Sequence, residues 1–176
     1  IGTVLRGGLP ARGWALRCLD VVPVPDVRPD EEHVVADVAD LAAITDATEG
    51  VDAVVHMGGI SGESTWESIL HTNIQGTYAV LEAARRAGVR RVVLASSNHA
   101  TGFTPRPESG LLREGDGPAR PDTYYGVSKL TMEGLGAGSP SYIAPETWYG
   151  KPDQIDHRID IYAIGAIVFR ALGGKP

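Results

Sequence analysis

Cysteine is nearly absent from this chain of 176 residues, in which Cys18 is the only one. A single thiol excludes an internal disulfide and a zinc site built from cysteines. An excess of basic residues is also lacking, because 16 Lys and Arg stand against 22 Asp and Glu and the net charge is −6. No basic stripe is available to neutralise nucleic-acid phosphates, so we expect no nucleic-acid partner.

Long hydrophobic runs are missing as well. The most apolar stretch, residues 161–172, is interrupted by Arg170 and is shorter than the ~20 residues that span a bilayer. No secretory signal is visible, and the first residue is Ile1 rather than methionine. The composition, 43% hydrophobic and 22% charged, is ordinary for a globular protein. We therefore expect a cytoplasmic enzyme with no membrane partner, about one domain in length.

Strand-like and helix-like segments alternate up to about residue 135. In the longest helical segment, apolar residues recur at three- and four-residue steps between Thr65 and Ala87, and Gly88 follows as a C-terminal glycine. Helices are expected at 1–9, 41–48, 65–87 and 123–135, and strands at 14–19, 33–36, 51–57 and 91–95. This alternation predicts a doubly wound α/β domain with a parallel sheet. A proline-rich loop, 105–121, is expected to lie over the site.

Aspartates, glycines and serines follow the ends of the predicted strands. They are Asp20, Asp37, Gly58, Gly59, Ser96 and Ser97. Ligands of such sheets bind beyond the carboxyl ends of the strands, so these residues share one predicted edge. Asp20 follows Gly2 by 18 residues, a spacing typical of the acid that binds an adenosine ribose, and its charge would favour NAD over NADP. Alternatively, Asp20 and the two glycines only form turns.

Tyr125 and Lys129 are the residues best suited to proton transfer. They stand four apart in the predicted helix 123–135 and therefore share one face of it. A neighbouring ammonium favours the phenolate that a general base requires. Ser97 ends an apolar strand, where its hydroxyl can hydrogen-bond the same substrate oxygen. Without that serine, Tyr125 would be a half-buried aromatic residue and Lys129 a solvated charge.

Residues 1–135 resemble an extended short-chain dehydrogenase of the NAD-dependent epimerase/dehydratase family. The pair formed by Tyr125 and Lys129 is common to the whole superfamily. The runs Gly-Gly-Ile-Ser at 58–61 and Ser-Ser-Asn-His at 96–99 are narrower and favour the uronate dehydrogenase branch. The other residues that carry the resemblance are Asp20, Asp37, Val38, His56, Met57 and Asn73.

The resemblance implies a Rossmann-like fold, NAD as cofactor and a small sugar acid as substrate. A hexuronate would be oxidised at C1 to an aldonolactone as hydride passes to the nicotinamide. The implied catalytic residues are Ser97, Tyr125 and Lys129. The implied cofactor contacts are Gly2, Asp20, Asp37, Val38, Gly58, Gly59, Asn73, Tyr125 and Lys129, and the implied substrate contacts are Ser61, Ser97, Asn98 and His99. In the alternative interpretation, His99 satisfies a loop carbonyl group.

Two parts of the family pattern are missing from the sequence. The family's first strand and glycine-rich loop are expected before Ile1, and only their last glycine, Gly2, is present. That strand is expected between the strand ending at Asp20 and the one ending at Met57, so both would lose a ladder partner, and the pyrophosphate would lose a helix N-terminus. The substrate-binding half of the family, with an arginine for the uronate carboxylate, does not follow Lys129.

Residues 138–176 resemble a different family, the serine/threonine protein kinases, in their large lobe, and we place this C-terminal piece at 136–176. Residues 138–146 match the end of an activation segment, and 156–176 match the helix after it. The glycine-rich loop, strand lysine, H-R-D and D-F-G motifs needed for kinase catalysis are absent. We predict a truncated NAD-binding domain at 1–135, joined near 134–138 to a mainly helical kinase-like fragment, with marginal stability for the whole.

These observations leave three functions open. The first is an NAD-dependent uronate or related sugar dehydrogenase, or an inactive remnant of one. The second is a sugar-nucleotide epimerase or dehydratase of the same fold, against which the run Ser-Asn-His speaks. The third is a non-catalytic fusion or interaction protein. Assays with uronate and with a nucleotide sugar separate the first two, and calorimetric titration with NAD separates both from the third.

Overall fold

The computed structural model describes residues 2–108, 110, 112 and 117–137. The elements are α1 (Gly2–Gly8), η1 (Pro10–Arg12), β1 (Leu16–Asp20), β2 (Glu31–Val35), α2 (Leu41–Thr48), β3 (Val54–His56), α3 (Trp66–Ile69), η2 (Leu70–Gln75), α4 (Gly76–Arg86), β4 (Val92–Leu94), η3 (Asn98–Ala100) and α5 (Tyr124–Ala137). The kinase resemblance from residue 138 on lies outside the described residues. Within them, no helix is long and apolar enough to cross a bilayer.

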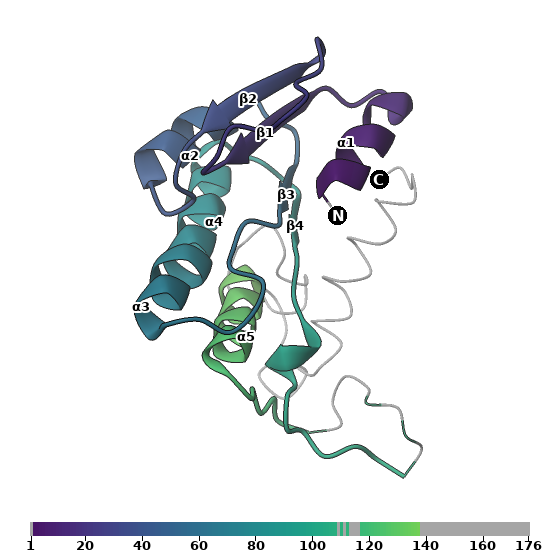
Figure 1. Cartoon of the computed structure of the whole chain (residues 1–176), viewed down its shortest axis with the longest axis vertical. Coiled ribbons are helices and arrows are strands. Elements are labelled where there is room, and N and C mark those ends of the chain that lie inside the picture. The colour runs from purple at the N-terminus through teal and green to yellow at the C-terminus, as the bar shows by residue number, and fades with distance from the viewer. Residues whose placement is uncertain (1, 109, 111, 113–116, 138–176) are drawn as a thin grey trace, which may run out of the picture.

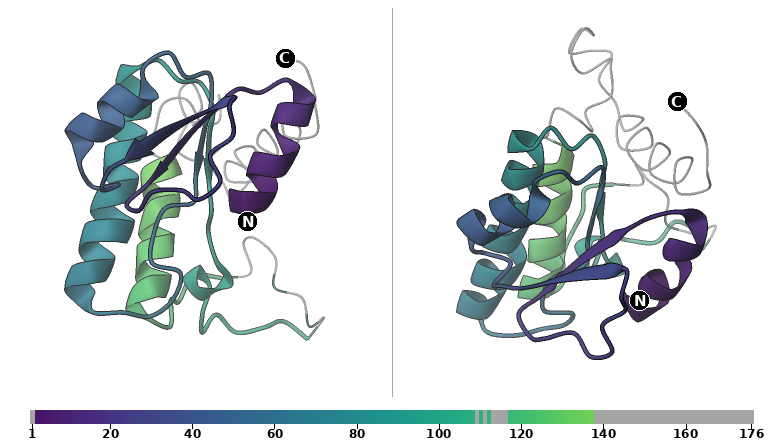
Figure 2. Two further views of the ribbon diagram at one scale, coloured as in Figure 1. Left: turned by 45° about the horizontal axis from the view of Figure 1, so that its top comes forward. Right: turned by 90° about the horizontal axis from the view of Figure 1, so that it is seen from above.

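The strands lie between two helical layers, as the predicted α/β class requires. Helices α2, α4 and α5 cover one side, and α1 lies on the other (Figures 1 and 2). The predicted helices and strands all form, within a few residues of their expected ends. The predicted C-terminal glycine is confirmed, since Gly88 follows the capping residue Ala87 of α4 and has φ of 70°.

The strands form two short parallel sheets instead of one continuous sheet. β1 pairs with β2, with Cys18 opposite His33, and β3 pairs with β4, with Val54 opposite Val92. In the described part of the chain, no ladder joins β1 to β3. Neighbouring strands must lie about 4.8 Å apart to exchange backbone hydrogen bonds. The interruption falls where the sequence predicted a missing ladder partner for both strands.

The long helix predicted over 65–87 is divided by a π-helical segment. Thr65 caps α3, with its hydroxyl accepting from the backbone N–H of Ser68 at 3.3 Å, and η2 then interrupts the α-helical pattern before α4. Period analysis could not reveal this, because the apolar spacing survives the wider turn. π-helical turns occur frequently at functional sites, and this one contains the buried Asn73.

Helix α4 supplies more of the buried apolar residues than any other described element. Its buried residues Ala79, Val80 and Ala83 pack against Ile44 of α2, and the cluster also contacts Leu19, Val38, Leu41 and Val54. On its other side, Leu81 and Ala84 pack with Val89 and Val92, beside Leu94 and Leu135. Because Leu19 belongs to β1 and Val54 to β3, apolar packing on α4 connects the two sheets that no ladder joins.

Helix α5 approaches the segment after β4 too closely for a side chain at Gly126. A Cβ there would overlap the carbonyl oxygen of His99 and lie 3.0 Å from Oδ1 of Asp122. The backbone N–H of Gly126 donates to the hydroxyl of Thr123 at 3.0 Å. This glycine therefore sets how near α5 comes to η3.

Helix α5 runs into the segment 134–138 where the junction is predicted, and the junction itself stays a prediction. Gly134 and Gly136 lie inside the helix, which continues to Ala137, beyond the expected end at 135. A Cβ at Gly136 would lie 2.8 Å from Cδ1 of Leu94. Close packing on β4 explains why this position is a glycine.

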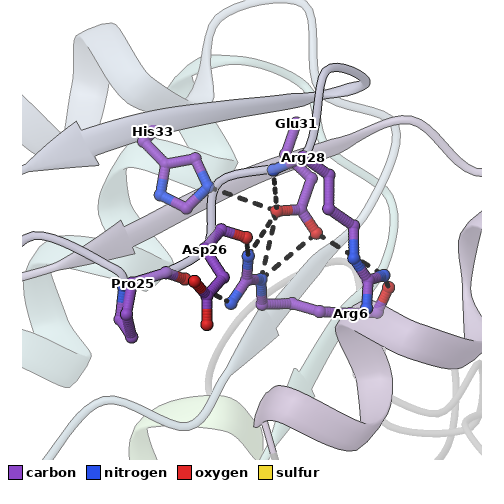
Figure 3. A network of polar contacts seen from close by, with 6 residues as sticks. All are labelled: Arg6, Pro25, Asp26, Arg28, Glu31 and His33. Carbon is purple, nitrogen blue, oxygen red and sulfur yellow. Dashed lines mark hydrogen bonds and ion pairs between the residues drawn. The ribbon is translucent and has the colours of Figure 1, made fainter.

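An ion-pair network ties α1 to β2 (Figure 3). The Arg6 guanidinium binds both carboxylate oxygens of Glu31, with the shortest contact at 2.6 Å. Arg28 lies 3.9 Å from the same carboxylate, and Nε2 of His33 lies 3.3 Å from it. The Glu31 side chain is fully buried. The hydrogen bond from Arg6 lowers the pKa of Glu31 to about 2.

The buried Glu31 should make the stability of the protein depend on pH. Its folded pKa lies below its ordinary value of 4.5, so the carboxylate stabilises the fold above about pH 4.5, and this contribution is lost as the pH falls towards about 2. Glu31→Gln leaves the Arg6 charge without its partner. We expect lower stability at neutral pH and a flatter pH dependence in this window, measured by urea unfolding. The exposed Glu67→Gln should behave like wild type, and an unchanged slope in Glu31→Gln would contradict the assignment.

Two glycines of α5 should respond oppositely to alanine. Gly126→Ala forces α5 away from His99 and should destabilise the protein by about 1–3 kcal/mol, the usual range for overpacking. No heavy atom of the described residues lies within 4 Å of a Cβ at Gly134. Gly134→Ala should therefore stabilise the helix by up to about 1 kcal/mol. Urea unfolding of both variants measures the difference, and equal effects would refute the packing argument.

Candidate active site

The residues predicted at the strand ends do gather at the carboxyl edges of the two sheets. Asp20 is the last residue of β1, and Asp37 follows β2 by two residues. Gly58 follows β3, and Ser97 follows β4. Since both pairs of strands are parallel and in register, each sheet carries one half of the predicted set at a single edge.

Tyr125 and Lys129 lie on α5 in a largely buried setting. Tyr125 is 9% exposed and Lys129 is 7% exposed. Nζ of Lys129 donates to the carbonyl oxygen of Ala95 at 2.7 Å and lies 5.5 Å from the centre of the Tyr125 ring. Burial lowers the pKa of Lys129. The ammonium therefore lies between the tyrosine and the end of β4.

The Ser-Ser-Asn-His run leads into the short helix η3, which lies beside the start of α5. Ser97 caps η3 by accepting from the backbone N–H of His99 at 3.3 Å, and it donates to Oδ1 of Asn98 at 3.3 Å. The His99 ring lies edge-on to the Tyr125 ring, with centroids 5.5 Å apart. In the described part of the chain, Ser97 and Tyr125 share no hydrogen bond, and His99 is the residue that connects them.

The Asn73 side chain forms all of its observed hydrogen bonds within the protein. Its Oδ1 accepts from the backbone N–H of Ile60 at 2.8 Å, and its Nδ2 donates to the Ile60 carbonyl oxygen at 3.1 Å and to the Ser128 hydroxyl at 3.0 Å. Gly59 has φ of 145°, and a Cβ there would lie 3.0 Å from Oδ1 of Asn73. This amide therefore fixes the 59–60 turn against α5.

Glu63 also fixes this loop, and the sequence analysis missed it. Its carboxylate accepts from the backbone N–H of Tyr125 at 3.1 Å, at the start of α5. The first N–H groups of a helix lack internal partners and attract negative charge. That rule could have suggested an acidic partner, but its position 62 residues away is a tertiary fact. The predicted substrate contact Ser61 is exposed in the same loop.

The predicted cofactor contacts Asp37, Val38 and Asp20 differ in their contacts within the protein. Asp37 binds Nε2 of His71 at 2.8 Å and accepts from the backbone N–H of Ala39 at 2.9 Å. The hydrogen bond with His71 lowers the pKa of Asp37 and raises that of His71. Val38 packs against Gly76, whose Cβ would lie 2.6 Å from it. Asp20 is exposed.

Gly2 and Gly58 complete the predicted cofactor set. Gly2 is exposed at the start of α1, on the side of the strands away from α5 (Figure 2). Gly58 lies against His56, whose ring would be 3.5 Å from a Cβ at that position. His56 is buried beneath the site, where Nε2 contacts Thr77 at 3.2 Å. Burial, and then the charge of Lys129, lower the pKa of His56 to about 4, so it is neutral near Lys129 at neutral pH.

One group of side chains has the composition of a metal site. Ligand atoms of Cys18, Glu31 and His33 lie within 4.8 Å of one another. However, the guanidinium of Arg6 already neutralises the Glu31 carboxylate (Figure 3). A cation would have to displace it, so this group is better described as part of the α1–β2 ion-pair network.

Among the described residues, cavities lie at both ends of the strands. One, of about 290 Å³, lies beside η3, and its lining includes Asn98, Thr101, Thr104 and Arg106. The other, of about 310 Å³, lies at the amino ends of the strands, and its lining includes Trp14, Asp52 and Arg91. The cavity at the amino ends of the strands is lined by no predicted site residue, whereas Asn98 lines the cavity beside η3. The cavity beside η3 is therefore assigned to the candidate site.

Comparisons with known proteins agree with this geometry. Residues 1–139 match the NAD dependent epimerase/dehydratase family. Uronate dehydrogenase of Pseudomonas putida is 45% identical over 134 residues, which is 76% of this chain and 49% of that protein. Uronate dehydrogenase of Agrobacterium fabrum is 46% identical over 136 residues, 77% of this chain and 50% of that protein.

A solved structure extends the likeness to three dimensions. A mutant uronate dehydrogenase of Agrobacterium tumefaciens, in complex with NAD, is 43% identical with a TM-score of 0.70, covering 77% of this chain and 50% of that one. The chain spans about half the length of the relatives it matches. With its tyrosine and lysine on α5 at the end of β4, this chain belongs to the NAD dependent epimerase/dehydratase family, whose members are enzymes that use NAD.

Proposed function

We propose that this chain carries the cofactor-binding and proton-transfer residues of a dehydrogenase that oxidises the C1 hydroxyl of a hexuronate to an aldonolactone. The observation that carries the proposal is that Tyr125 and Lys129 are both buried on α5. Lys129 donates a hydrogen bond to the carbonyl oxygen of Ala95, two residues before Ser97. The similarity to uronate dehydrogenases supports this choice of substrate. We further propose a catalytic unit at 1–135, with 136–176 as a separate piece.

In this proposal Tyr125 is the general base. The C1 hydroxyl gives its proton to the Tyr125 oxygen, the C1–H bond breaks with its electron pair, and a C=O bond forms at C1. NAD supplies the acceptor for that hydride. Nζ of Lys129 lies 5.5 Å from the centre of the Tyr125 ring, which places its positive charge beside the proposed base. Ser97 donates a hydrogen bond to the reacting oxygen.

The cofactor would lie along the carboxyl ends of the strands. Asp20, at the end of β1, accepts from the adenosine ribose hydroxyls and disfavours a 2′-phosphate. Asp37 and Val38 border the adenine, with Asp37 oriented by His71. The backbone at Gly58 and Gly59 allows a close approach, and Gly2 and Asn73 stay predicted contacts of the cofactor.

The substrate would lie between η3 and the loop that carries Ser61. Asn98 and His99 face it from η3, and Asn98 also lines the cavity that includes Arg106. A hexuronate offers hydroxyls and a carboxylate, which suit amide, imidazole and guanidinium groups. Incubation of the whole chain with NAD and a hexuronate, followed at the absorbance of NADH, tests the proposal. Turnover with a nucleotide sugar instead would favour the epimerase/dehydratase alternative.

Tyr125→Phe removes the base and should lower turnover by about 10²–10⁴-fold, the usual contribution of a general base. NAD affinity, measured by calorimetry, should change little, because the ring and Lys129 remain. The neighbouring Tyr124 is 53% exposed. Tyr124→Phe should therefore keep its rate and serves as the matched control. A Tyr125→Phe protein with the rate of wild type would remove this residue from the chemistry.

Asp20→Ala should weaken NAD about 10–100-fold, the cost of one charge-assisted hydrogen bond, and should relax discrimination against NADP. Asp30→Ala removes an exposed carboxylate from the connection between β1 and β2 and should leave both affinities unchanged. Calorimetric titrations with NAD and NADP measure the effect. An unaltered preference in Asp20→Ala would show that the ribose does not bind there.

A further inference from the structure

Asp122 holds His99 in a single orientation. Nδ1 of His99 lies 2.9 Å and 3.0 Å from the two carboxylate oxygens of Asp122. The ring is also packed edge-on against Tyr125, with centroids 5.5 Å apart. Both neighbours constrain the imidazole, because rotating it would break the contact with the carboxylate and lose the packing against the phenol ring.

Asp122 is in turn held at the start of α5. The Thr123 hydroxyl donates to Oδ1 of Asp122 at 3.0 Å and also accepts from the backbone N–H of Gly126. The Asp122 side chain is 24% exposed. The hydrogen bond from His99 lowers the pKa of Asp122, so this group remains a carboxylate at neutral pH.

The tautomer of His99 follows from this contact. A carboxylate can only accept hydrogen bonds, so the proton of a neutral imidazole must be on Nδ1. Nε2 then carries a lone pair and accepts. The His99 side chain is 44% exposed, and no group of the described residues bonds its Nε2. The acceptor atom is thus available on the same ring that touches Tyr125.

We propose that Asp122 is a positioning residue that fixes His99 as the Nδ1–H tautomer, so that Nε2 accepts a hydrogen bond from a hydroxyl of the substrate. The tautomer depends only on the contacts above, whereas the identity of the donor rests on the proposed function. A hydroxyl-bearing sugar satisfies this acceptor. A substrate carboxylate cannot donate a hydrogen bond to Nε2 of neutral His99, because both groups are acceptors. His99 therefore recognises the hydroxyl side of the sugar acid.

Long-range ¹H–¹⁵N spectra of the imidazoles in the ¹⁵N-labelled whole chain test the inference directly. At mildly alkaline pH, where imidazoles are neutral, the resonances lost in His99→Gln identify His99. The wild-type protein should show Nδ1 protonated and Nε2 unprotonated. Asp122→Ala should shift His99 towards the Nε2–H tautomer. A wild-type His99 protonated on Nε2 would overturn the proposal without any variant.

Glu63→Ala is the matched control for Asp122→Ala. Glu63 also lies at the start of α5, where its carboxylate accepts from the backbone N–H of Tyr125 at 3.1 Å. It makes no hydrogen bond to His99 among the described contacts. Glu63→Ala should leave the tautomer unchanged. If it shifts His99 as much as Asp122→Ala does, Asp122 acts only through the helix, and the positioning assignment fails.

Titration with a hexuronate and with acetate separates the ligand assignment from the tautomer. The hexuronate should shift the Nε2 resonance of the wild-type protein, and acetate, which carries no hydroxyl, should not. A shift with acetate alone would overturn the hydroxyl assignment. If neither ligand shifts Nε2 while Nδ1 remains protonated, the positioning by Asp122 stands, and the proposed substrate class is wrong.

Discussion

The hydrogen bond from the Lys129 ammonium to the carbonyl oxygen of Ala95 is the contact on which the geometry of the site depends. It joins α5 to the end of β4 at 2.7 Å. Around it, the ammonium lies near the Tyr125 ring, and α5 can approach η3 because Gly126 has no side chain. A buried charge is costly unless it is hydrogen-bonded. The same carbonyl thus compensates the burial of Lys129 and sets the position of Tyr125.

Apolar packing on α4 joins the two sheets, as hydrogen bonds between strands would in a continuous sheet. Leu19 from β1 and Val54 from β3 contact the same cluster, although their strands share no ladder in the described part of the chain. Hydrophobic contact is not directional, so it can join two sheets without fixing their register. The relative position of the two halves of the predicted cofactor site therefore depends on this helix.

Polar side chains next to the site form hydrogen bonds mainly within the protein. Asn73 fixes the turn at Ile60, His71 orients Asp37, and Asp122 orients His99. In each pair, the residue that a sequence motif singles out is held by a partner distant in the chain. Buried or half-buried polar groups need such partners. Among the described residues, Nε2 of His99 has no such partner, and the exposed Asp20 carboxylate accepts only from the nearby backbone N–H of Val22.

The sequence alone determined the element types, the family and the set of strand-end residues, because periodicity and short motifs are local properties of the chain. The family resemblance, rather than any local pattern, implied the missing ladder partner between β1 and β3. Tertiary structure alone decided that Asn73 turns inward, that Glu63 meets the start of α5, and that Asp122 binds His99. These contacts join residues 23 to 62 positions apart, and no spacing rule reaches that far.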